Sequence, residues 1–286
     1  MEKVIPTKQY NGHVLALPRI APALVCLCLL LFPLPGCDLL PSITVNGTPG
    51  TSTSNGSQLK VWNKVAPGVE VRYEDWKNPG GDHDTVTIMR FDLRQVKLSV
   101  GYQPAQPLFM RDWMQQQRAI AIINGGYFDQ RDNATALVVS NGKVFGESYV
   151  GFGGMLSVDA HGNVSLRSLS RQPFDPNQEE LQQATQSSPM LVLGGKRTQF
   201  SADASQPRRS VVAMDKQGRL LFIVSPNQVF SLDQLADQLA SSDLSIDAAL
   251  NLDGGASTGL YANAGSSHVA IDSLVRLPIV IIIKAT

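Results

Sequence analysis

The chain has 286 residues, 43% of them hydrophobic, and its 24 lysines and arginines balance 24 aspartates and glutamates. A balanced charge gives no electrostatic footprint for nucleic acid or for an anionic membrane surface, so neither is expected to bind the folded part of the chain. The hydrophobic content is sufficient for a sizeable core, and the length allows one large domain or two small ones.

Residues 1–36 have the features of a secretory signal peptide. Basic residues precede an apolar stretch, IAPALVCLCLLLFPLPGC, that is interrupted by prolines. A membrane-spanning helix needs roughly 20 apolar residues, so this shorter run does not predict a stable spanning helix.

The stretch ends in LPGC, which resembles the lipobox of bacterial lipoproteins, with Pro35 where a small residue is usual. The resemblance implies that Cys37 is acylated and becomes the mature N-terminus, so that the protein is exported to the periplasm and anchored to a membrane by its lipid. Asp38, directly after this cysteine, implies retention in the inner membrane. An ordinary cleaved signal peptide or an uncleaved anchor is the alternative.

All three cysteines lie in this leader, which leaves the rest of the chain without a disulfide framework, a thiolate nucleophile or a cysteine metal site. Residues 37–59 follow the leader, and most of them form the polar stretch PSITVNGTPGTSTSNGSQ, which cannot bury apolar area. We predict a flexible tether there. From residue 60 to residue 286 the pattern is that of one folded domain.

The first part of that domain predicts strands followed by a helix. Residues 64–76 and 84–102 alternate apolar and polar residues, are rich in β-branched ones, and are joined by the turn sequence KNPGGDHD. Residues 107–119 have apolar residues at helical spacing. Residues 120–128 form an apolar strand that ends abruptly at Asn-Gly-Gly.

Hairpins dominate the middle of the domain. The turn signals Asn-Gly, Ala-His-Gly-Asn and Asp-Lys-Gln-Gly predict hairpins over residues 135–146, 153–169 and 208–225. Many hairpins with few helices predict an α+β fold, in which a mostly antiparallel or mixed β-sheet carries flanking helices.

Two more helices and three buried strands complete the predicted elements. Residues 176–187 are polar and are predicted to be helical. Residues 231–242 begin with Ser231 as the N-cap and have apolar residues at the i, i+3, i+4 period of a helix. The strands are predicted at residues 189–196, 248–252 and 277–286.

Signatures of several enzyme classes are missing from the sequence. It contains no Gly-x-Ser-x-Gly elbow, no His-Glu-x-x-His, no Walker loop and no dinucleotide-binding fingerprint. The histidines beyond the leader, His83, His161 and His268, lie in polar turns or loops, so neither a histidine triad nor a zinc site is expected. We predict no cofactor and no metal.

The segment ALNLDGGAST is a candidate site. Alternation along a strand puts Asn251 and Asp253 on one face and the adjacent leucines on the other, which predicts a small polar pocket at the strand end. Gly254 and Gly255 lack a Cβ, so a ligand could approach the backbone N–H groups there. Two hydroxyl side chains follow that could add contacts, Ser257 and Thr258. An ordinary Asp-Gly turn is the alternative.

The segment AIINGGYFD repeats this design. Its apolar strand runs into Asn124, Gly125 and Gly126, and Tyr127 then provides an aromatic ring suited to stacking on a sugar. The two strand ends could meet at one edge of a sheet. The alternative is an independent turn with a core aromatic residue.

Two adjacent arginines begin the strand RRSVVAMD. Arginine recognises phosphate or carboxylate groups by paired hydrogen bonds, so Arg208 and Arg209 are candidates for an anion contact. A solvated or ion-paired strand edge is the alternative.

In this order, the segments INGGYF, SSPMLVLGG, RRSVVAMD with FSLDQLADQL, and ALNLDGGASTGL resemble the phosphodiester glycosidase family, and they indicate a member from a bacterial envelope. The similarity covers residues 60–286. Ser188, Ser210 and Ala256 depart from the family's Gly, Thr and Gly, which bears more on substrate fit than on fold. The resemblance implies the family's fold and hydrolysis of a sugar-1-phosphodiester at the anomeric carbon, in envelope or extracellular polysaccharide.

The same resemblance implies roles for the candidate residues. Asp253 would serve as base for water or as electrostatic stabiliser, and Arg209 would clamp the phosphate. Asn124 and Asn251 would hold sugar hydroxyls or orient Asp253. The other expected substrate contacts are Gly125, Gly126, Tyr127, Gly254, Gly255, Ser257 and Thr258.

A second carboxylate is expected under the usual two-carboxylate scheme of glycosidases, and Asp129, Glu74 and Asp92 are candidates that the sequence does not rank. Two non-catalytic functions stay open. A carbohydrate- or phosphate-binding protein that assists polysaccharide assembly would keep the same polar groups. A cation site at Asp253 would need many more oxygens than one carboxylate supplies, since calcium takes six to eight.

Overall fold

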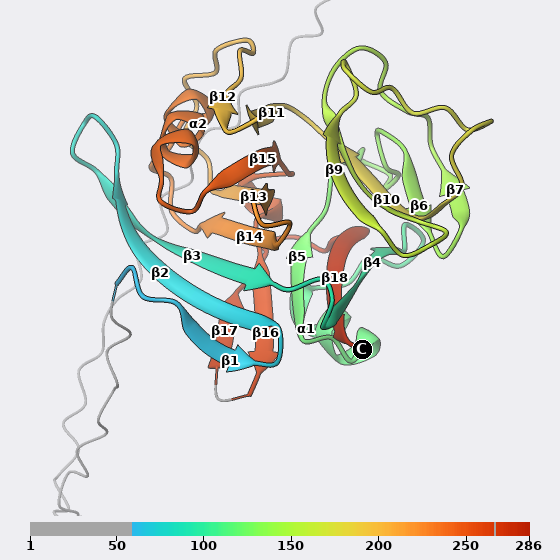
Figure 1. The fold of residues 1–286 in the computed structure, drawn as a ribbon, viewed down its shortest axis with the longest axis horizontal. Coiled ribbons are helices and arrows are strands. Elements are labelled where there is room, and N and C mark those ends of the chain that lie inside the picture. The colour runs from blue at the N-terminus through green and yellow to red at the C-terminus, as the bar shows by residue number, and fades with distance from the viewer. Residues whose placement is uncertain (1–58, 266) are drawn as a thin grey trace, which may run out of the picture. The chain divides into compact units, whose positions relative to one another are not determined.

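Three antiparallel β-sheets and two helices build the part of the chain that the structure, a computed structural model, describes: residues 59–265 and 267–286 (Figure 1). These residues belong to one compact unit. The predicted α+β fold with mostly antiparallel sheet is confirmed. The signal peptide, the lipobox and nearly all of the tether lie outside the described residues.

Each sheet has its own set of strands. The first sheet has the order β1 (Asn63–Ala66), β2 (Val69–Lys77), β3 (His83–Phe91), β14 (Leu220–Ser225), β13 (Arg209–Asp215), β15 (Ile246–Asn251), β11 (Met190–Leu193), β12 (Lys196–Arg197). The second has β17 (Ser267–Ile271), β16 (Leu260–Ala264), β5 (Ala121–Asn124), β18 (Ile279–Ala285), β4 (Val96–Tyr102). The third has β7 (Lys143–Phe145), β6 (Val138–Ser140), β10 (Leu181–Ser187), β8 (Gly154–Asp159), β9 (Val164–Ser168).

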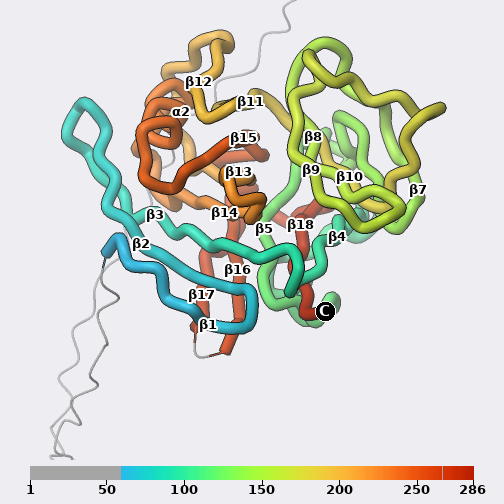
Figure 2. The backbone as a smooth tube through the Cα atoms, in the orientation of Figure 1, coloured from blue at the N-terminus to red at the C-terminus, as the bar shows by residue number. Residues whose placement is uncertain are grey.

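The chain moves between the sheets rather than completing them one at a time. It leaves the first sheet after β3, adds β4 and β5 to the second, forms the third from β6 to β10, and returns to the first at β11 (Figure 2). The last three strands, β16 to β18, rejoin the second sheet. The ends of β5 and β15 therefore belong to different sheets.

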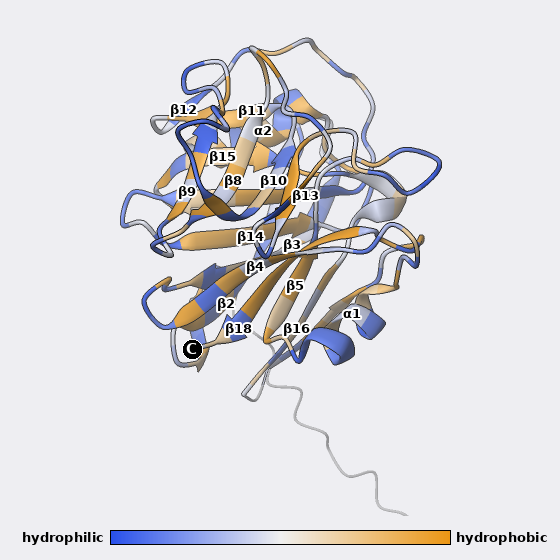
Figure 3. Cartoon of the chain, turned by 90° about the vertical axis from the view of Figure 1, so that its right-hand side faces the viewer, coloured by the Kyte–Doolittle hydropathy of each residue, from blue (hydrophilic) through white to orange (hydrophobic). Residues whose placement is uncertain are grey.

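The main core lies between the first and second sheets. Fully buried residues point into it from both, such as Phe222 of β14, Leu250 of β15 and Ile281 of β18. Phe91 and Phe222 meet edge to face with ring centroids 4.9 Å apart. Figure 3 shows the hydrophobic colour concentrated on strands such as β3, β5 and β14. Alternation along the strands provides this apolar face.

A helix covers the outer face of each of these two sheets. Helix α2 (Leu232–Ser241) packs on the first sheet and α1 (Met110–Gln117) on the second. The predicted N-cap of α2 is confirmed, because the Ser231 hydroxyl accepts from the Gln234 N–H while the Gln234 side chain accepts from the Ser231 N–H.

The three predicted hairpins are present as β6–β7, β8–β9 and β13–β14. Asn141 and Gly142 have φ angles of 52° and 75°, the left-handed conformation that a two-residue hairpin turn requires. The final strand β18 is central in the second sheet, as its apolar run predicted.

The helix predicted over residues 176–187 is wrong, because β10 occupies residues 181–187 between β6 and β8. Its glutamines suggested a solvated helix, yet two of them are buried and hydrogen-bonded. Gln183 accepts the Val100 N–H at 2.8 Å, and Gln186 accepts the Tyr149 N–H at 2.9 Å. Partners far away in the sequence thus compensate the burial of these amides.

The hairpin β16–β17, with His268 in β17, has no counterpart among the predicted elements. Helices of the described residues are all too short or too polar to cross a membrane.

Candidate functional site

The two candidate strand ends meet where the first and second sheets come together. The Asn124 side chain donates from Nδ2 to the backbone carbonyl of Asp253 at 2.7 Å, and the Asp253 N–H donates to the Gly125 carbonyl at 3.1 Å. Asn124 Oδ1 accepts the Gly259 N–H at 3.2 Å. The expected proximity of the ends of β5 and β15 is confirmed, although they join two sheets rather than lying at one edge of a single sheet.

The Asp253 carboxylate is held in a partly buried position just beyond β15. Its Oδ1 accepts the Gly254 N–H at 2.9 Å. Burial raises the pKa of Asp253 above the ordinary aspartate value, and hydrogen bonds from Ser257 and the Gly254 N–H oppose that rise. The site therefore holds a carboxylate whose proton affinity is higher than that of an exposed aspartate.

Asn251 and Tyr127 form a hydrogen-bond network next to this carboxylate. Asn251 Nδ2 donates to the Tyr127 hydroxyl at 2.8 Å and to the Ser188 carbonyl at 2.9 Å, and the Tyr127 hydroxyl donates to the same carbonyl at 2.8 Å. Burial raises the pKa of Tyr127 to about 12, and the charge of Asp253 adds to the rise. Tyr127 is thus a stable hydrogen-bond donor, and one residue of the β10–β11 connection, Ser188, joins the network.

Arg209 lies on the same face of the first sheet as Asn251. The register pairs Val211 with Asn251, and the Leu252 N–H donates to the Ser210 carbonyl at 2.9 Å. Continuing this antiparallel register past the end of β15 would bring the backbone of Asp253 opposite Arg209. The charge of neither residue acts on the pKa of the other, so the carboxylate and the guanidinium are not in direct contact.

The Arg209 guanidinium is buried and bonded to backbone carbonyls. It donates to Phe230 at 3.1 Å and to Ser205 at 2.8 Å. Burial lowers its pKa, while the charge of Asp203 raises it. The described residues contain no ion pair to Arg209 within 4.0 Å, so its positive charge is only partly compensated.

Three candidate glycine amides donate within the protein instead of facing a ligand. The Gly125 N–H donates to Ile279, that of Gly254 to Asp253 Oδ1, and that of Gly255 to the Arg208 carbonyl. A Cβ on Gly125 would lie 2.4 Å from Ile279. The expectation that these amides reach a ligand is wrong, because close packing and turn geometry require the glycines.

Several other candidates are enclosed by protein. Asn124, Asn251 and Thr258 have almost no exposed surface. Both polar atoms of the Asn124 side chain are already bonded, so Asn124 orients the Asp253 backbone and is not free to hold a sugar hydroxyl. A Cβ on Gly126 would lie 2.1 Å from the Gln186 carbonyl. The partly exposed members of the candidate set are Tyr127, Asp253, Gly254 and Gly255.

Two of the three candidates for a second carboxylate are far from Asp253. Glu74 pairs with buried Arg72 at 2.7 Å on β2, four strands from β15 and so roughly 19 Å away at the usual strand spacing. Asp92 follows β3 at the end of the sheet where Phe91 pairs with Leu220, opposite to the end that holds Asp253.

The third candidate, Asp129, is exposed and caps its own turn. Its Oδ1 accepts the N–H groups of Arg131 and Asn133 at 2.8 and 2.9 Å. Those hydrogen bonds lower the pKa of Asp129. Across the described residues, no group of three histidine, cysteine or acidic side chains could hold a metal ion.

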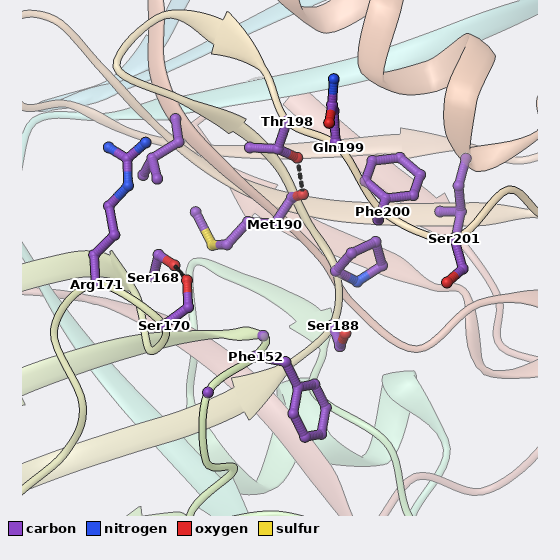
Figure 4. Close-up of a pocket in the computed structure, with 15 residues that line it drawn as sticks. Phe152, Ser168, Ser170, Arg171, Ser188, Met190, Thr198, Gln199, Phe200 and Ser201 are labelled. Atoms are coloured by element: carbon purple, nitrogen blue, oxygen red, sulfur yellow. Dashed lines mark hydrogen bonds between the residues drawn. The ribbon is translucent and has the colours of Figure 1, made fainter.

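A cavity of about 550 Å³ with both polar and apolar walls lies next to the Ser188 end of the network (Figure 4). Part of its wall is formed by Ser188, Pro189 and Met190. The Asn251 N–H donates to the Pro189 carbonyl at 3.0 Å, which connects this wall to the candidate site. Asp253 itself does not line this cavity. No pattern in the sequence indicated this cavity, because its walls come from segments far apart in the chain.

A family model described as phosphodiester glycosidase matches residues 117–280, more than half of the chain. Among solved structures, the catalytic domain of zebrafish N-acetylglucosamine-1-phosphodiester alpha-N-acetylglucosaminidase, auto-inhibited by its pro-peptide, is similar with a TM-score of 0.59 and 20% identity, covering 80% of this chain and 87% of that chain. A hypothetical protein from Synechocystis is similar with a TM-score of 0.58 and 16% identity, over 77% of this chain and 62% of that one. No curated protein sequence matches the chain. At these identities the structural likeness concerns the fold, which agrees with the one implied by the sequence motifs.

Proposed function

The chain belongs to the phosphodiester glycosidase family, and from this premise we propose that it hydrolyses the C1–O–P linkage of a sugar-1-phosphodiester. Water would add at the anomeric carbon, and the bond from C1 to the phosphate oxygen would break. The products are a free sugar and a phosphate monoester.

The geometry of Asp253 carries the proposal. Its backbone is fixed by Asn124 and Gly125, and its carboxylate is fixed by the Gly254 N–H. Burial raises its pKa, which brings a carboxylate base closer to the pH at which a base is most effective. Asp253 would activate the water or stabilise positive charge at the anomeric carbon.

The leaving group explains why one carboxylate could be sufficient. A phosphate monoester leaves as a stable anion, with a second pKa of about 6, so it needs less protonation than a sugar alkoxide. Neither another carboxylate nor a cation contributes to the pKa shift of Asp253. We therefore choose a cation for the departing charge because of this leaving-group chemistry.

Arg209 is the cation that we propose for the phosphate. Its guanidinium has no ionic partner within 4.0 Å in the described chain, and the sheet register brings it opposite Asp253. The charges of both residues act on the pKa of Tyr127, so Tyr127 lies within electrostatic range of each. The hydroxyl of Tyr127 would hold the sugar or the phosphate at this point.

We also propose that the substrate is an envelope or extracellular polysaccharide. The support is the leader sequence, whose LPGC resembles a lipobox and implies an anchor at Cys37 in the periplasm. Lipid labelling of the full-length protein and of Cys37→Ser, followed by membrane fractionation, tests this. Unlabelled wild-type protein would exclude the anchor.

A binding protein without turnover is the second candidate function. The observation that favours it is the burial of Asn124, Asn251 and Thr258, which leaves few side chains free for substrate. Such a protein would bind the glycan through Arg209 and Tyr127 and release it unchanged.

Turnover on defined substrates distinguishes the two. We would measure release of UDP from UDP-GlcNAc and of phosphate monoester from a set of sugar-1-phosphodiesters. Wild type would be compared with Asp253→Asn and with Asp247→Asn, an exposed carboxylate on the same strand. Loss of turnover in Asp253→Asn alone supports hydrolysis. Glycan binding shared by all three proteins, without turnover, supports the binding function.

A further inference from the structure

The cavity beside Ser188 has the composition of a carbohydrate subsite. Hydroxyl groups, aromatic rings and one cation line it, among them Phe152, Ser168, Arg171, Ser188, Thr198 and Phe200. In Figure 4, Arg171 and the serines Ser168 and Ser170 lie on one side of Met190, and Phe200 lies on the other. Hydroxyls that can both donate and accept suit sugar hydroxyls, and flat apolar rings suit the C–H faces of a pyranose.

Among the residues that the structure describes, Arg171 is the only charged side chain in the wall of this cavity. It is exposed, and among the described residues its guanidinium makes no ion pair and no hydrogen bond, whereas its backbone N–H donates to the Ser168 carbonyl. An unpaired guanidinium among hydroxyls favours a ligand with a negatively charged group, which it can bind through paired hydrogen bonds.

The aromatic part of the wall continues toward Asp253. Phe152 is 52% exposed, and its ring stacks on Tyr149 with centroids 4.5 Å apart and planes 27° from parallel. Thr135 connects this stacked pair to the candidate site, because its hydroxyl lies 3.4 Å from the Tyr149 hydroxyl and 3.2 Å from the Tyr127 backbone carbonyl. Exposed large side chains grouped in this way are typical of a binding surface.

Hydrogen bonds connect the cavity to the same site. Ser188 lines the cavity, and its carbonyl accepts from both Tyr127 and Asn251. Asn251 is the last residue of β15 and lies two residues before Asp253. A chain of sugars with its scissile bond at Asp253 would therefore have its next unit beside Ser188.

We propose that this cavity binds the sugar unit next to the scissile linkage, and that this unit carries a negative charge. The inference rests on the proposed function, which places the scissile bond at Asp253. It narrows the substrate from any sugar-1-phosphodiester to an anionic oligosaccharide. Arg171 binds the anionic group, and Phe152 and Phe200 contact the sugar ring. The anion is a phosphate of the next repeat or a uronate carboxylate.

Kinetics with a short and a long substrate test the subsite. The short substrate is a sugar-1-phosphate methyl diester, and the long one is a phosphodiester-linked trisaccharide. We expect Arg171→Gln and Phe152→Ala each to lower the ratio of kcat/KM for the long substrate to that for the short one by about tenfold or more, equivalent to roughly 1.4 kcal/mol. Arg94→Gln, an exposed arginine beyond β3, is the control that keeps the ratio. An unchanged ratio in both cavity variants overturns the proposal.

Binding to Asp253→Asn separates this inference from the proposed function. Calorimetry with the phosphodiester trisaccharide, a uronate trisaccharide and a neutral trisaccharide identifies the anion. The subsite is supported if Asp253→Asn binds one anionic trisaccharide more tightly than the neutral one and if this preference is lost in the double variant Asp253→Asn with Arg171→Gln. This holds even if no substrate is turned over. Equal binding of all three ligands, or none, overturns it, whereas absent turnover by itself contradicts only the hydrolysis.

Discussion

The side-chain amide of Asn124 donates a 2.7 Å hydrogen bond to the backbone carbonyl of Asp253, 129 positions later in the chain. The other end of the same amide accepts the Gly259 N–H. One buried side chain therefore fixes both the start and the end of the turn that presents the Asp253 carboxylate. The end of β5, in the second sheet, acts as the support for the turn after β15, in the first.

Replacing Asn124 by alanine should reduce both stability and activity. The variant leaves the Asp253 carbonyl and the Gly259 N–H buried without partners, which costs about 2–4 kcal/mol of unfolding free energy. A freed turn would also lower kcat. The matched control is Gln183→Ala. It removes a buried side-chain amide of β10 that has two hydrogen-bond partners, Val100 and Asn141. Equal kcat losses in the two variants, measured on folded protein, would show that Asn124 has no special relation to Asp253.

Asp253→Asn should make the protein more stable at neutral pH. Burial raises the pKa of Asp253 in the folded state, so the native protein binds this proton more tightly than the unfolded chain. That contribution to stability is present below the unfolded pKa of about 3.9 and is lost as the pH rises through the folded pKa. The neutral amide avoids the loss.

Thermal unfolding from pH 3 to pH 8 measures this effect. We expect the variant to exceed wild type at pH 7 by on the order of 1 kcal/mol or less, roughly 2–4 °C in Tm at most, with the gap closing below about pH 4. Asp247→Asn, on the exposed part of the same strand, should show no such pattern. A variant that melts below wild type at pH 7 would mean that hydrogen bonds to the carboxylate outweigh its burial.

Arg209→Lys should weaken the binding of substrate phosphate. A lysine cannot reproduce the two hydrogen bonds to the Phe230 and Ser205 carbonyls while presenting a planar group to phosphate. We expect kcat/KM to fall by roughly tenfold or more, mainly through KM. Arg208→Lys is the control, because Arg208 precedes β13 and its guanidinium donates to the Pro226 and Asp272 carbonyls, away from Tyr127. A larger loss of kcat/KM in Arg208→Lys than in Arg209→Lys would show that Arg208, not Arg209, binds the substrate phosphate.

Gly126→Ala should destabilise the fold rather than alter the binding of substrate alone. The added Cβ would lie 2.1 Å from the Gln186 carbonyl, a backbone atom that cannot move without disturbing β10, and we expect a cost of about 3 kcal/mol or more. Gly254→Ala meets the Arg208 carbonyl at 2.9 Å and should cost less. Denaturant unfolding of both variants gives the order, and the reverse order would contradict the packing explanation.

The meeting of the two strand ends could be predicted because the same design occurs twice. Each apolar strand stops at an Asn or Asp followed by two glycines, and the alternation of side chains fixed the orientation of Asn251 and Asp253. Local capping and turn chemistry likewise located Ser231 as an N-cap and Asn141-Gly142 as a hairpin turn.

What could not be predicted depends on contacts between distant segments. Residues 176–187 have a helical composition, and only pairing with β6 and β8 makes part of them a strand. The role of Gly125 and Gly126 as packing positions follows from Ile279 and Gln186, which no local pattern identifies. The cavity beside Ser188 combines loops of the third sheet with the edge of the first, so its walls have no signature in the sequence.

The site of bond cleavage tests the central claim most directly. Hydrolysis of a sugar-1-phosphodiester in ¹⁸O-labelled water, analysed by mass spectrometry of both products, reports which atom the water attacks. A glycosidase centred on Asp253 places the label on the anomeric carbon of the sugar and leaves the phosphate monoester unlabelled, and Asp253→Asn removes this labelled product. Label in the phosphate monoester would show attack at phosphorus and would contradict the proposed reaction.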